Sequence, residues 1–359
     1  ITPEDAGALD VLQNFLTATG FTCHRKQFED VDNLYARIGT SAPNLCFAGH
    51  TDVVPPGDET LWTHPPFDAA IADGRLYGRG TTDMKCAIAA FAVAADRFVK
   101  SKGTTFEGSI SLLITGDEEG PSVNGTIRVL PWITEMGEDL DACIVGEPTN
   151  PNVFGTMMKI GRRGSMNMKL SVSGIQGHSA YPHMADNPIP HMIKMLSALT
   201  DEPLDLGSEH FQPSTLVITS VDVGNPATNV IPSDITAAFN IRFNDLHTGE
   251  SMEQLVRKRL DSINHGYKLS TKVSGTSFVS QPGKLTSVVS DSVEAVTGHK
   301  PEASTTGGTS DARFIKDYCP VVEFGLISDT AHKTDENVAV DDIIALSEIY
   351  ELIIDKYLS

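Results

Sequence analysis

Two patterns of apolar residues divide the chain. In its first and last parts, short and mostly apolar stretches, such as residues 44–48 and 109–115, predict buried strands. Longer amphipathic or alanine-rich stretches predict helices over residues 1–19, 86–99 and 341–357. Buried strands that alternate with helices are typical of an α/β domain with a covered central sheet. We therefore expect an α/β domain with a mixed sheet, built from both ends of the sequence.

Strict alternation replaces this pattern between residues 164 and 275. Over 165–173 the apolar side chains occupy every second position, beginning with Met166, which predicts a strand with one covered face. The elements predicted after it are a helix over 188–200, strands over 215–223 and 235–243, a helix over 249–263 and a strand over 267–273. This β-α-β-β-α-β order is typical of a ferredoxin-like α+β unit. We predict that residues 164–275 form it as an insertion into the α/β domain of residues 1–163 and 276–359.

Charge and composition narrow the classes of function. The 359 residues carry a formal net charge of −20, which argues against a nucleic-acid partner, because phosphate binding needs a basic surface. No apolar run approaches the ~20 residues of a membrane-spanning helix, so no membrane partner is expected. The five cysteines are scattered without a C-x-x-C pair. This spacing favours free thiols in a reducing, cytoplasmic setting over a disulfide framework.

Candidate chemistry begins where the apolar run at 44–48 ends, in the sequence His50-x-Asp52. Side chains two positions apart on an extended segment point to the same side, so the Asp52 carboxylate can hold one ring nitrogen of His50. A metal-binding histidine needs such a partner, because it fixes the tautomer and leaves the other nitrogen free for the ion. Taken alone, the pair is more typical of a histidine that is satisfied by local hydrogen bonds.

Other candidate ligands follow predicted strands or begin helices, and they are Asp83, Glu118, Glu119, Glu147 and His332. In open α/β sheets, ligands bind at the carboxyl ends of the strands. Asp83 lies in a glycine-flanked loop, where it is either an ordinary helix N-cap or a carboxylate that faces His50. Glu118 and Glu119 would point to opposite sides in extended backbone, so that one can bind metal while the other faces the substrate.

Two histidines and three carboxylates could hold two divalent ions. If Asp83 bridges the ions, His50 and Glu147 complete the ligands of the first. Glu119 and His332 then complete the ligands of the second. Each ion has three protein ligands and one open position, which is the arrangement of catalytic zinc sites.

Several other polar positions have a possible role around this ligand set. Glu118 is left over beside a ligand, where a general base belongs. His178 lies in a glycine-punctuated loop, Arg242 lies on the polar face of its strand, and the Gly/Thr/Ser loop over 304–313 can present backbone N–H groups to an anion. Four other histidines lack such a context and are expected to be exposed or locally capped: His191, His210, His247 and His265.

The chain resembles the dinuclear zinc aminoacylase and carboxypeptidase family in seven motifs that span nearly its whole length: G-H-T-D-V-V-P-P-G-D, W-T-H-P-P-F, L-Y-G-R-G-T-T-D-M-K, D-E-E-G, G-E-P-T, G-x-x-G-H-x-A-Y-P-H and S-T-T-G-G-T-S-D-A-R-F. The resemblance implies a zinc-exopeptidase-like catalytic domain that holds two divalent ions, Zn²⁺ first and Co²⁺ as a substitute. It implies the same five ligands and Glu118 as the acid/base, and we count Asp52, which would hold His50, among the catalytic residues. It also implies a cis peptide at Asp83–Met84. Cys86 stands where the family usually has glycine, and we expect it to be a small packed side chain.

The resemblance further implies how a substrate is held. His178 would reach the active site of a neighbouring protomer and stabilise the tetrahedral oxyanion. This would occur in a homodimer formed through the inserted domain, which would also act as a lid. The residues that would hold substrate carboxylates are Arg162, Asn229, Arg242, Gly308, Thr309 and Ser310.

The implied reaction is hydrolysis of the amide bond of a small-molecule substrate. The substrate that this resemblance implies is N-succinyl-LL-2,6-diaminopimelate, in lysine and diaminopimelate biosynthesis. One alternative is a related metallo-deacylase or peptidase that acts on another compound, such as N-acetylornithine. Another is a non-catalytic binding protein of the same fold, which is disfavoured because all five ligands and Glu118 are present.

Overall fold

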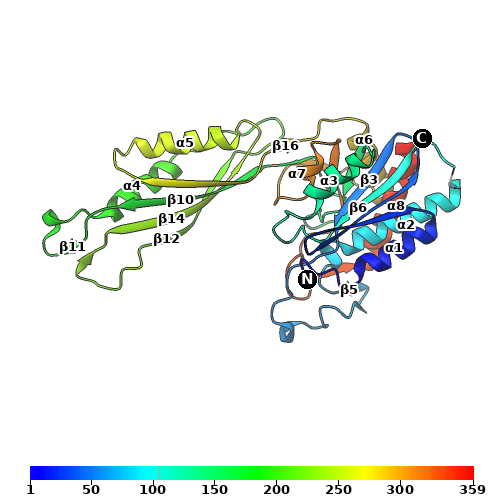
Figure 1. Cartoon of the computed structure of the whole chain (residues 1–359), viewed down its shortest axis with the longest axis horizontal. Coiled ribbons are helices and arrows are strands. Elements are labelled where there is room, and N and C mark those ends of the chain that lie inside the picture. Colours follow the sequence, from blue (N-terminus) through cyan, green and yellow to red (C-terminus); the bar gives the residue numbers. More distant parts are fainter. Residues whose placement is uncertain (104) are drawn as a thin grey trace. The chain divides into compact units, whose positions relative to one another are not determined.

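The computed structural model of the chain describes residues 1–103 and 105–359 and divides into two compact units (Figure 1). The first unit consists of Ile1–Ile160, Ser280–Ser304 and Ser310–Ser359, and the second of Gly161–Val279 and Thr305–Thr309. The main segment of the second unit extends a few residues beyond each end of the predicted range of 164–275, and Thr305–Thr309, which we predicted to lie in the α/β domain, belongs to the second unit as well. Among the described residues, no helix combines the length and the hydrophobicity that a membrane span requires.

The first unit is built on a mixed sheet, as predicted, and this sheet has eight strands. Its strands, in spatial order, are β1 (Thr22–Phe28), β2 (Val31–Gly39), β6 (Ser109–Thr115), β3 (Asn44–His50), β7 (Ala142–Val145), β18 (Val321–Glu323), β8 (Met157–Lys159) and β17 (Glu302–Ser304). β3 pairs in parallel with both β6 and β7, and every residue of β3 is buried. The apolar runs therefore form the centre of the sheet, and the carboxyl ends of these three strands lie at one edge.

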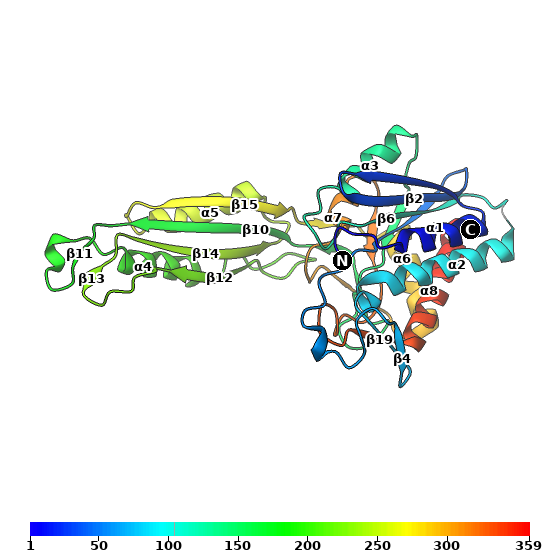
Figure 2. The same cartoon turned by 60° about the horizontal axis from the view of Figure 1, so that its bottom comes forward.

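Helices cover both faces of this sheet (Figure 2). They are α1 (Ala8–Thr19), α2 (Cys86–Lys102), α3 (Thr126–Glu135), α6 (Lys284–Thr297), α7 (Ala312–Ile315) and α8 (Val340–Leu358). α2 contacts α1 and α8, whereas α3 contacts α7 and β6. The rings of Phe47 on β3, Phe91 on α2 and Tyr350 on α8 pack with centroids 4.5 to 5.5 Å apart, which joins the central strand to two helices. A smaller sheet of β4 (Ala70–Ala72), β5 (Arg75–Tyr77) and β19 (Asn337–Ala339) completes the unit.

The first helix starts later than predicted. α1 begins at Ala8, after Gly7 at φ 88°, rather than in the first few residues. The Asp5 carboxylate accepts hydrogen bonds from the backbone N–H groups of Gly7 and Leu9 at 3.0 Å, and such local bonds compete with helix formation. Gly20 ends the helix in the left-handed conformation, as predicted.

The second unit has the ferredoxin-like order predicted for it. Along the chain it consists of β10 (Gly164–Ser173), α4 (Pro188–Thr200), β12 (Thr215–Asp222), β14 (Asp234–Phe243), α5 (Gly249–Asp261) and β15 (Lys268–Gly275). The strands form an antiparallel sheet in the order β12-β14-β10-β15. α4 and α5 lie on the same side of this sheet (Figure 1), and side chains such as Met166, Phe239, Met192 and Val256 form one core between them. The unit therefore has a hydrophobic core of its own.

Two pairs of short strands lie at the ends of this sheet. β9 (Gly161–Arg162) pairs with β16 (Phe278–Val279) where the chain enters and leaves the unit, directly before β10. β11 (Gly177–His178) pairs with β13 (Val230–Ile231) after the opposite end of β10. β10 has 10 residues, so the two strand pairs are separated by about 30 Å at ~3.3 Å per residue.

Candidate metal centre

His50 is the last residue of β3 and is 1% exposed. Its Nδ1 lies 2.9 Å from the backbone carbonyl oxygen of Asp52 and 3.5 Å from the Asp52 carboxylate. The main-chain carbonyl is therefore the closer partner of Nδ1, and the carboxylate that we predicted lies beside the same nitrogen. A hydrogen bond from Nδ1–H to this carbonyl leaves Nε2 available as a metal ligand.

The Asp52 carboxylate holds the acidic turn that follows β6. It accepts hydrogen bonds from the backbone N–H groups of Glu118 at 3.3 Å and Glu119 at 3.0 Å. The chain bends after Thr115 instead of continuing as extended backbone, so the expectation that Glu118 and Glu119 point to opposite sides does not hold. One oxygen of each carboxylate and one ring nitrogen of His50 all lie within 4.8 Å of one another.

Asp83 spans two histidines. Its Oδ1 lies 3.1 Å from His50 Nε2, and its Oδ2 lies 3.2 Å from His332 Nε2. The residue lies inside the turn Thr81–Lys85 before α2, so it is not the ordinary helix N-cap that was the alternative. The Asp83–Met84 peptide is cis, as the family resemblance implied. Each oxygen of this carboxylate therefore faces a different imidazole.

His332 and Glu119 lie on one side of Asp83, and His332 Nε2 is 2.7 Å from Glu119 Oε1. On the other side, Glu147 Oε1 lies 3.6 Å from His50 Nε2. Two groups of three result, each with its ligand atoms within 4.8 Å of one another, and the groups share Asp83. The structure thus brings all five predicted ligands together. These two groups have the members that the sequence analysis supposed, while a third group joins His50 to Glu118 and Glu119.

Burial and charge act in opposite directions on these groups. Burial disfavours the charged form of Asp83, but hydrogen bonds from the two histidines outweigh it and hold the pKa of Asp83 below its usual range. Hydrogen bonds to Asp83 and Glu119 raise the pKa of His332 to about 10. Burial disfavours protonation of His50, yet hydrogen bonds to Asp52 and Asp83 raise its pKa well above the usual value. The protonated rings of His50 and His332 therefore place positive charge beside these carboxylates. Divalent ions bound at the same position would supply that charge instead.

Glu147 provides a direct test of whether a cation fits. The residue is 8% exposed, and its Oε1 has no hydrogen-bond partner among the described residues. A buried carboxylate oxygen without a donor is costly, and burial raises the pKa of Glu147 well above its usual range. A divalent ion beside this oxygen would remove the cost. The donor set of imidazole nitrogen and carboxylate oxygen, with no cysteine, suits a catalytic rather than a structural zinc site.

Glu118 lies at the edge of this ligand set. Burial raises the pKa of Glu118 to about 8, while His50 opposes the shift and Asp311 and Glu119 add to it. Asp311 is itself buried and accepts a hydrogen bond from Thr126 Oγ1 at 2.6 Å. A carboxyl group with a pKa near neutrality can both accept and donate a proton, so Glu118 has the properties of an acid/base.

A buried ion pair that we did not predict holds the turn of Asp83. Glu336 Oε1 accepts hydrogen bonds from three backbone N–H groups of this turn, that of Asp83 included, at 2.9 to 3.1 Å. Arg79 Nη1 lies 2.5 Å from Glu336 Oε2, and the guanidinium also donates to the backbone carbonyl of His332 at 3.4 Å. One ion pair therefore links the two turns that carry Asp83 and His332.

His178 and Asn229 lie together at one end of the second unit. His178, on β11, pairs across the ladder with Val230, the neighbour of Asn229. The histidine is exposed, and its Nδ1 accepts a hydrogen bond from the backbone N–H of Ala180 at 3.1 Å. This bond fixes the orientation of the imidazole within its loop.

The other predicted substrate-binding residues of this unit lie in or near its opposite end, where β9 pairs with β16. They are Arg162, Arg242, Gly308 and Thr309. Arg162 Nη1 is 3.5 Å from the backbone carbonyl oxygen of Thr306, in the loop that holds both of the other loop residues. Arg242 pairs with Ser165, near the start of β10. Because the length of β10 separates the two groups, a single second unit does not gather them around one small molecule.

Two side chains of the first unit are packed into its interior. Ser310 is 1% exposed, and its hydroxyl donates to Glu323 Oε1 at 2.6 Å, so any contact of Ser310 with a substrate would use its backbone N–H. Cys86 is buried, and burial raises the pKa of its thiol to about 12, so it is the small packed side chain that we expected.

The class of two-metal amide hydrolases combines the features described here: a mixed sheet, an inserted ferredoxin-like unit and two groups of histidine and carboxylate ligands that share one aspartate. The chain belongs to peptidase family M20/M25/M40, whose sequence model matches residues 46–356. It is 57% identical to a succinyl-diaminopimelate desuccinylase of Rhodospirillum centenum over 99% of this chain and 94% of that protein. It is 53% identical to a succinyl-diaminopimelate desuccinylase of Parvibaculum lavamentivorans over 99% of this chain and 92% of that protein.

Solved structures share the fold. An M20 family metallo-carboxypeptidase from Sulfolobus solfataricus superposes with a TM-score of 0.78 and 18% sequence identity, covering 99% of this chain and 94% of the other. At that identity, the likeness concerns the architecture alone.

Proposed function

We propose that this chain hydrolyses the amide bond of N-succinyl-LL-2,6-diaminopimelate to succinate and LL-2,6-diaminopimelate. The observation that carries the proposal is the sharing of Asp83 between two clusters of imidazole and carboxylate ligands. The substrate follows from the two relatives, each more than half identical to this chain and each a succinyl-diaminopimelate desuccinylase. They favour a succinyl substrate over N-acetylornithine.

The ligands of two divalent ions, zinc foremost and cobalt as a substitute, would be His50, Asp83 and Glu147 for one ion and Asp83, Glu119 and His332 for the other. Such a pair of ions supplies a water of low pKa and polarises the carbonyl that is attacked. Asp83 would bridge, since each of its oxygens faces a different histidine. Asp52 would orient His50 through its main-chain carbonyl and the acidic turn through its carboxylate.

Glu118 would carry the proton of the reaction. Its carboxylate takes a proton from the attacking water, while the hydroxyl of that water joins the acyl carbon. When the C–N bond breaks, Glu118 returns the proton to the leaving amine, so the elements of one water are added across the amide. A pKa raised by burial supports this role, because the group must gain and lose a proton in each turnover.

We further propose that two chains assemble through their second units and that His178 of one protomer serves the active site of the other. The separation of His178 and Asn229 from Arg162 and Arg242 by the length of β10 supports this arrangement, since one chain alone keeps them apart. The two arginines would hold substrate carboxylates, and His178 would donate a hydrogen bond to the oxyanion. Positive groups at short range matter more than the net charge of −20, because distant charges are screened within about 8–10 Å.

The test is hydrolysis of N-succinyl-LL-2,6-diaminopimelate by chelated enzyme, with and without added Zn²⁺, beside N-acetylornithine. We expect no turnover after chelation and recovery with zinc on the succinyl substrate alone. Cleavage of N-acetylornithine instead would keep the metal centre and overturn the substrate. Failure to cleave either compound with two zinc ions bound would overturn the proposed reaction.

A further inference from the structure

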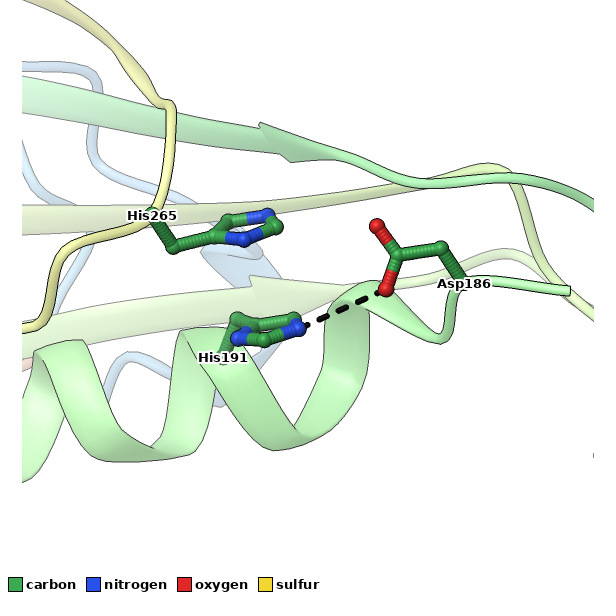
Figure 3. Close-up of side chains that lie close together, drawn as sticks. All are labelled: Asp186, His191 and His265. Atoms are coloured by element: carbon green, nitrogen blue, oxygen red, sulfur yellow. Dashed lines mark ion pairs between the residues drawn. The ribbon is translucent and has the colours of Figure 1, made fainter. Parts of the chain in front are cut away.

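A second group of possible metal ligands meets within the second unit (Figure 3). Asp186 precedes α4, His191 lies near the start of α4, and His265 lies on the turn between α5 and β15. We predicted that His191 and His265 would be exposed or locally capped. Instead, both are partly buried and their rings stack on each other. The three side chains point toward one another, with Asp186 beside the stacked rings.

The distances are close to those of ligands that share one ion. His191 Nε2 lies 3.4 Å from Asp186 Oδ1, and one ligand atom of each of the three residues lies within 4.8 Å of the other two. Two ligands of a tetrahedral zinc ion are about 3.3 Å apart, because each lies about 2.0–2.1 Å from the metal. The ligand atoms are therefore already gathered at nearly the spacing that one ion requires.

The backbone holds two of the three residues in place. Asp186 exchanges two backbone hydrogen bonds with Ile175, at 2.8 and 3.0 Å. Asn187 caps α4 with its side chain, which fixes the start of the helix and therefore the position of His191. His265 lies on a turn outside regular structure, where its side chain has more freedom to rotate.

We propose that Asp186, His191 and His265 bind one divalent transition-metal ion, of the zinc and copper class, at a site separate from the two-metal centre. Two imidazoles and a carboxylate are ligand types that these ions take, whereas Mg²⁺ and Ca²⁺ prefer oxygen ligands. Three protein ligands leave a fourth position for water. The carboxylate of Asp186 adds an electrostatic attraction for a divalent cation.

Binding of the ion must separate the two rings. Their centroids are 3.7 Å apart and their planes differ by 5°. The lone pairs of an imidazole lie in its plane, so parallel stacked rings cannot both direct a nitrogen at the same ion. His191 is already aligned with Asp186, so His265 is the ring that rotates. Asp186 and Ile175 also close the loop that carries His178, so the ion would tie the base of that loop to α4 and to the turn of His265.

The first test counts zinc ions in the full-length chain. Chelated protein is equilibrated with a small excess of Zn²⁺, and bound metal is measured by elemental mass spectrometry. We expect wild type to hold one more ion per chain than His191→Ala or His265→Ala. His299→Ala, which removes an exposed histidine of the first unit, is the matched control and should equal wild type. Equal zinc content in wild type and both cluster variants overturns the proposal.

A second measurement keeps the proposal testable where alanine variants fold poorly. Asp186→Asn preserves the shape of the site and removes its charge, and we expect it to weaken the additional ion by about tenfold or more. In the NMR spectrum of wild type, Zn²⁺ should shift the ring signals of His191 and His265 and remove the ring-current effect of their stacking. Ring signals that stay unchanged while the two-metal centre fills would refute the site. Neither readout depends on the proposed reaction, so the two proposals can fail separately.

Discussion

The ion pair of Arg79 and Glu336 offers the sharpest test of how the metal ligands are positioned, through the substitution Glu336→Gln. Glu336 is 0% exposed, and its Oε1 accepts three backbone hydrogen bonds from the turn of Asp83. Glutamine has the same shape and can still accept these bonds through its carbonyl. It cannot balance the guanidinium of Arg79, which would remain buried without its counter-charge.

The expected loss of stability follows from this imbalance. Removal of one partner of a buried ion pair costs about 3–5 kcal/mol, because an uncompensated charge stays in the interior. We expect the free energy of unfolding of chelated Glu336→Gln, measured by urea denaturation, to fall by about that amount. The affinity for zinc should fall as well, because the same pair links the turns of Asp83 and His332.

Two measurements distinguish an effect on the stability of the protein from an effect on the positions of the metal ligands. Glu348→Gln removes the same charge from an exposed position on α8 and should leave both the unfolding free energy and the zinc affinity unchanged. A Glu336→Gln protein that is as stable as wild type would refute the argument from the buried charge. A protein that loses stability but binds zinc with wild-type affinity would show that the pair supports the fold without positioning the ligands.

Four further predictions concern the proposed reaction. Glu118→Gln should bind both metal ions yet lose about 10²–10⁴-fold in kcat, measured beside its zinc content; near wild-type kcat would remove Glu118 from the mechanism. Burial raises the pKa of Glu118 to about 8 from an ordinary 4.5, so the folded chain retains a proton that the unfolded chain has lost. The stability of chelated protein should therefore fall between pH 4.5 and 8, and Glu118→Gln should flatten that fall in thermal unfolding scans. Arg162→Ala and Arg242→Ala should each raise KM strongly in steady-state assays, and unchanged KM in both would exclude the arginines as carboxylate clamps. Mixing inactive His178→Ala with inactive Glu118→Gln should restore part of the activity, because a mixed dimer holds one complete site; no recovery after subunit exchange would exclude a shared site.

Patterns that are local in the sequence predicted most of the fold. Alternation of apolar residues identified β10, and the helical pattern located α4 to the residue, because each element buries one face against a single core. α1 was placed too early because hydrogen bonds from the backbone N–H groups of Gly7 and Leu9 to the Asp5 carboxylate replace the first turn of the helix that was predicted over residues 1–19.

His50, Glu119 and Glu147 could be predicted because they lie at or just after the ends of buried strands, and Asp83 could be predicted because it lies in a glycine-flanked loop. The groups that position them could not. Arg79 and Glu336 are 257 residues apart, and the only signal for the pair was a charged residue between two glycines. His191 and His265 meet only because α4 and the turn after α5 pack on the same side of the sheet. Contacts of this kind depend on the tertiary fold and cannot be predicted from the spacing of residues in the sequence.

Neighbouring strands of the eight-stranded sheet are synthesised at different times. The apolar strand β7 is made before the second unit, but its neighbour β18 follows that unit in the sequence. While the ribosome synthesises the insertion, the edge of β7 that later pairs with β18 has no partner strand. Unpaired apolar edges are sites of aggregation. Early folding of the second unit around its own core would shorten this vulnerable interval. Variants that slow the folding of the insertion should therefore lower the yield of active protein in the cell, even where the finished molecule is fully stable.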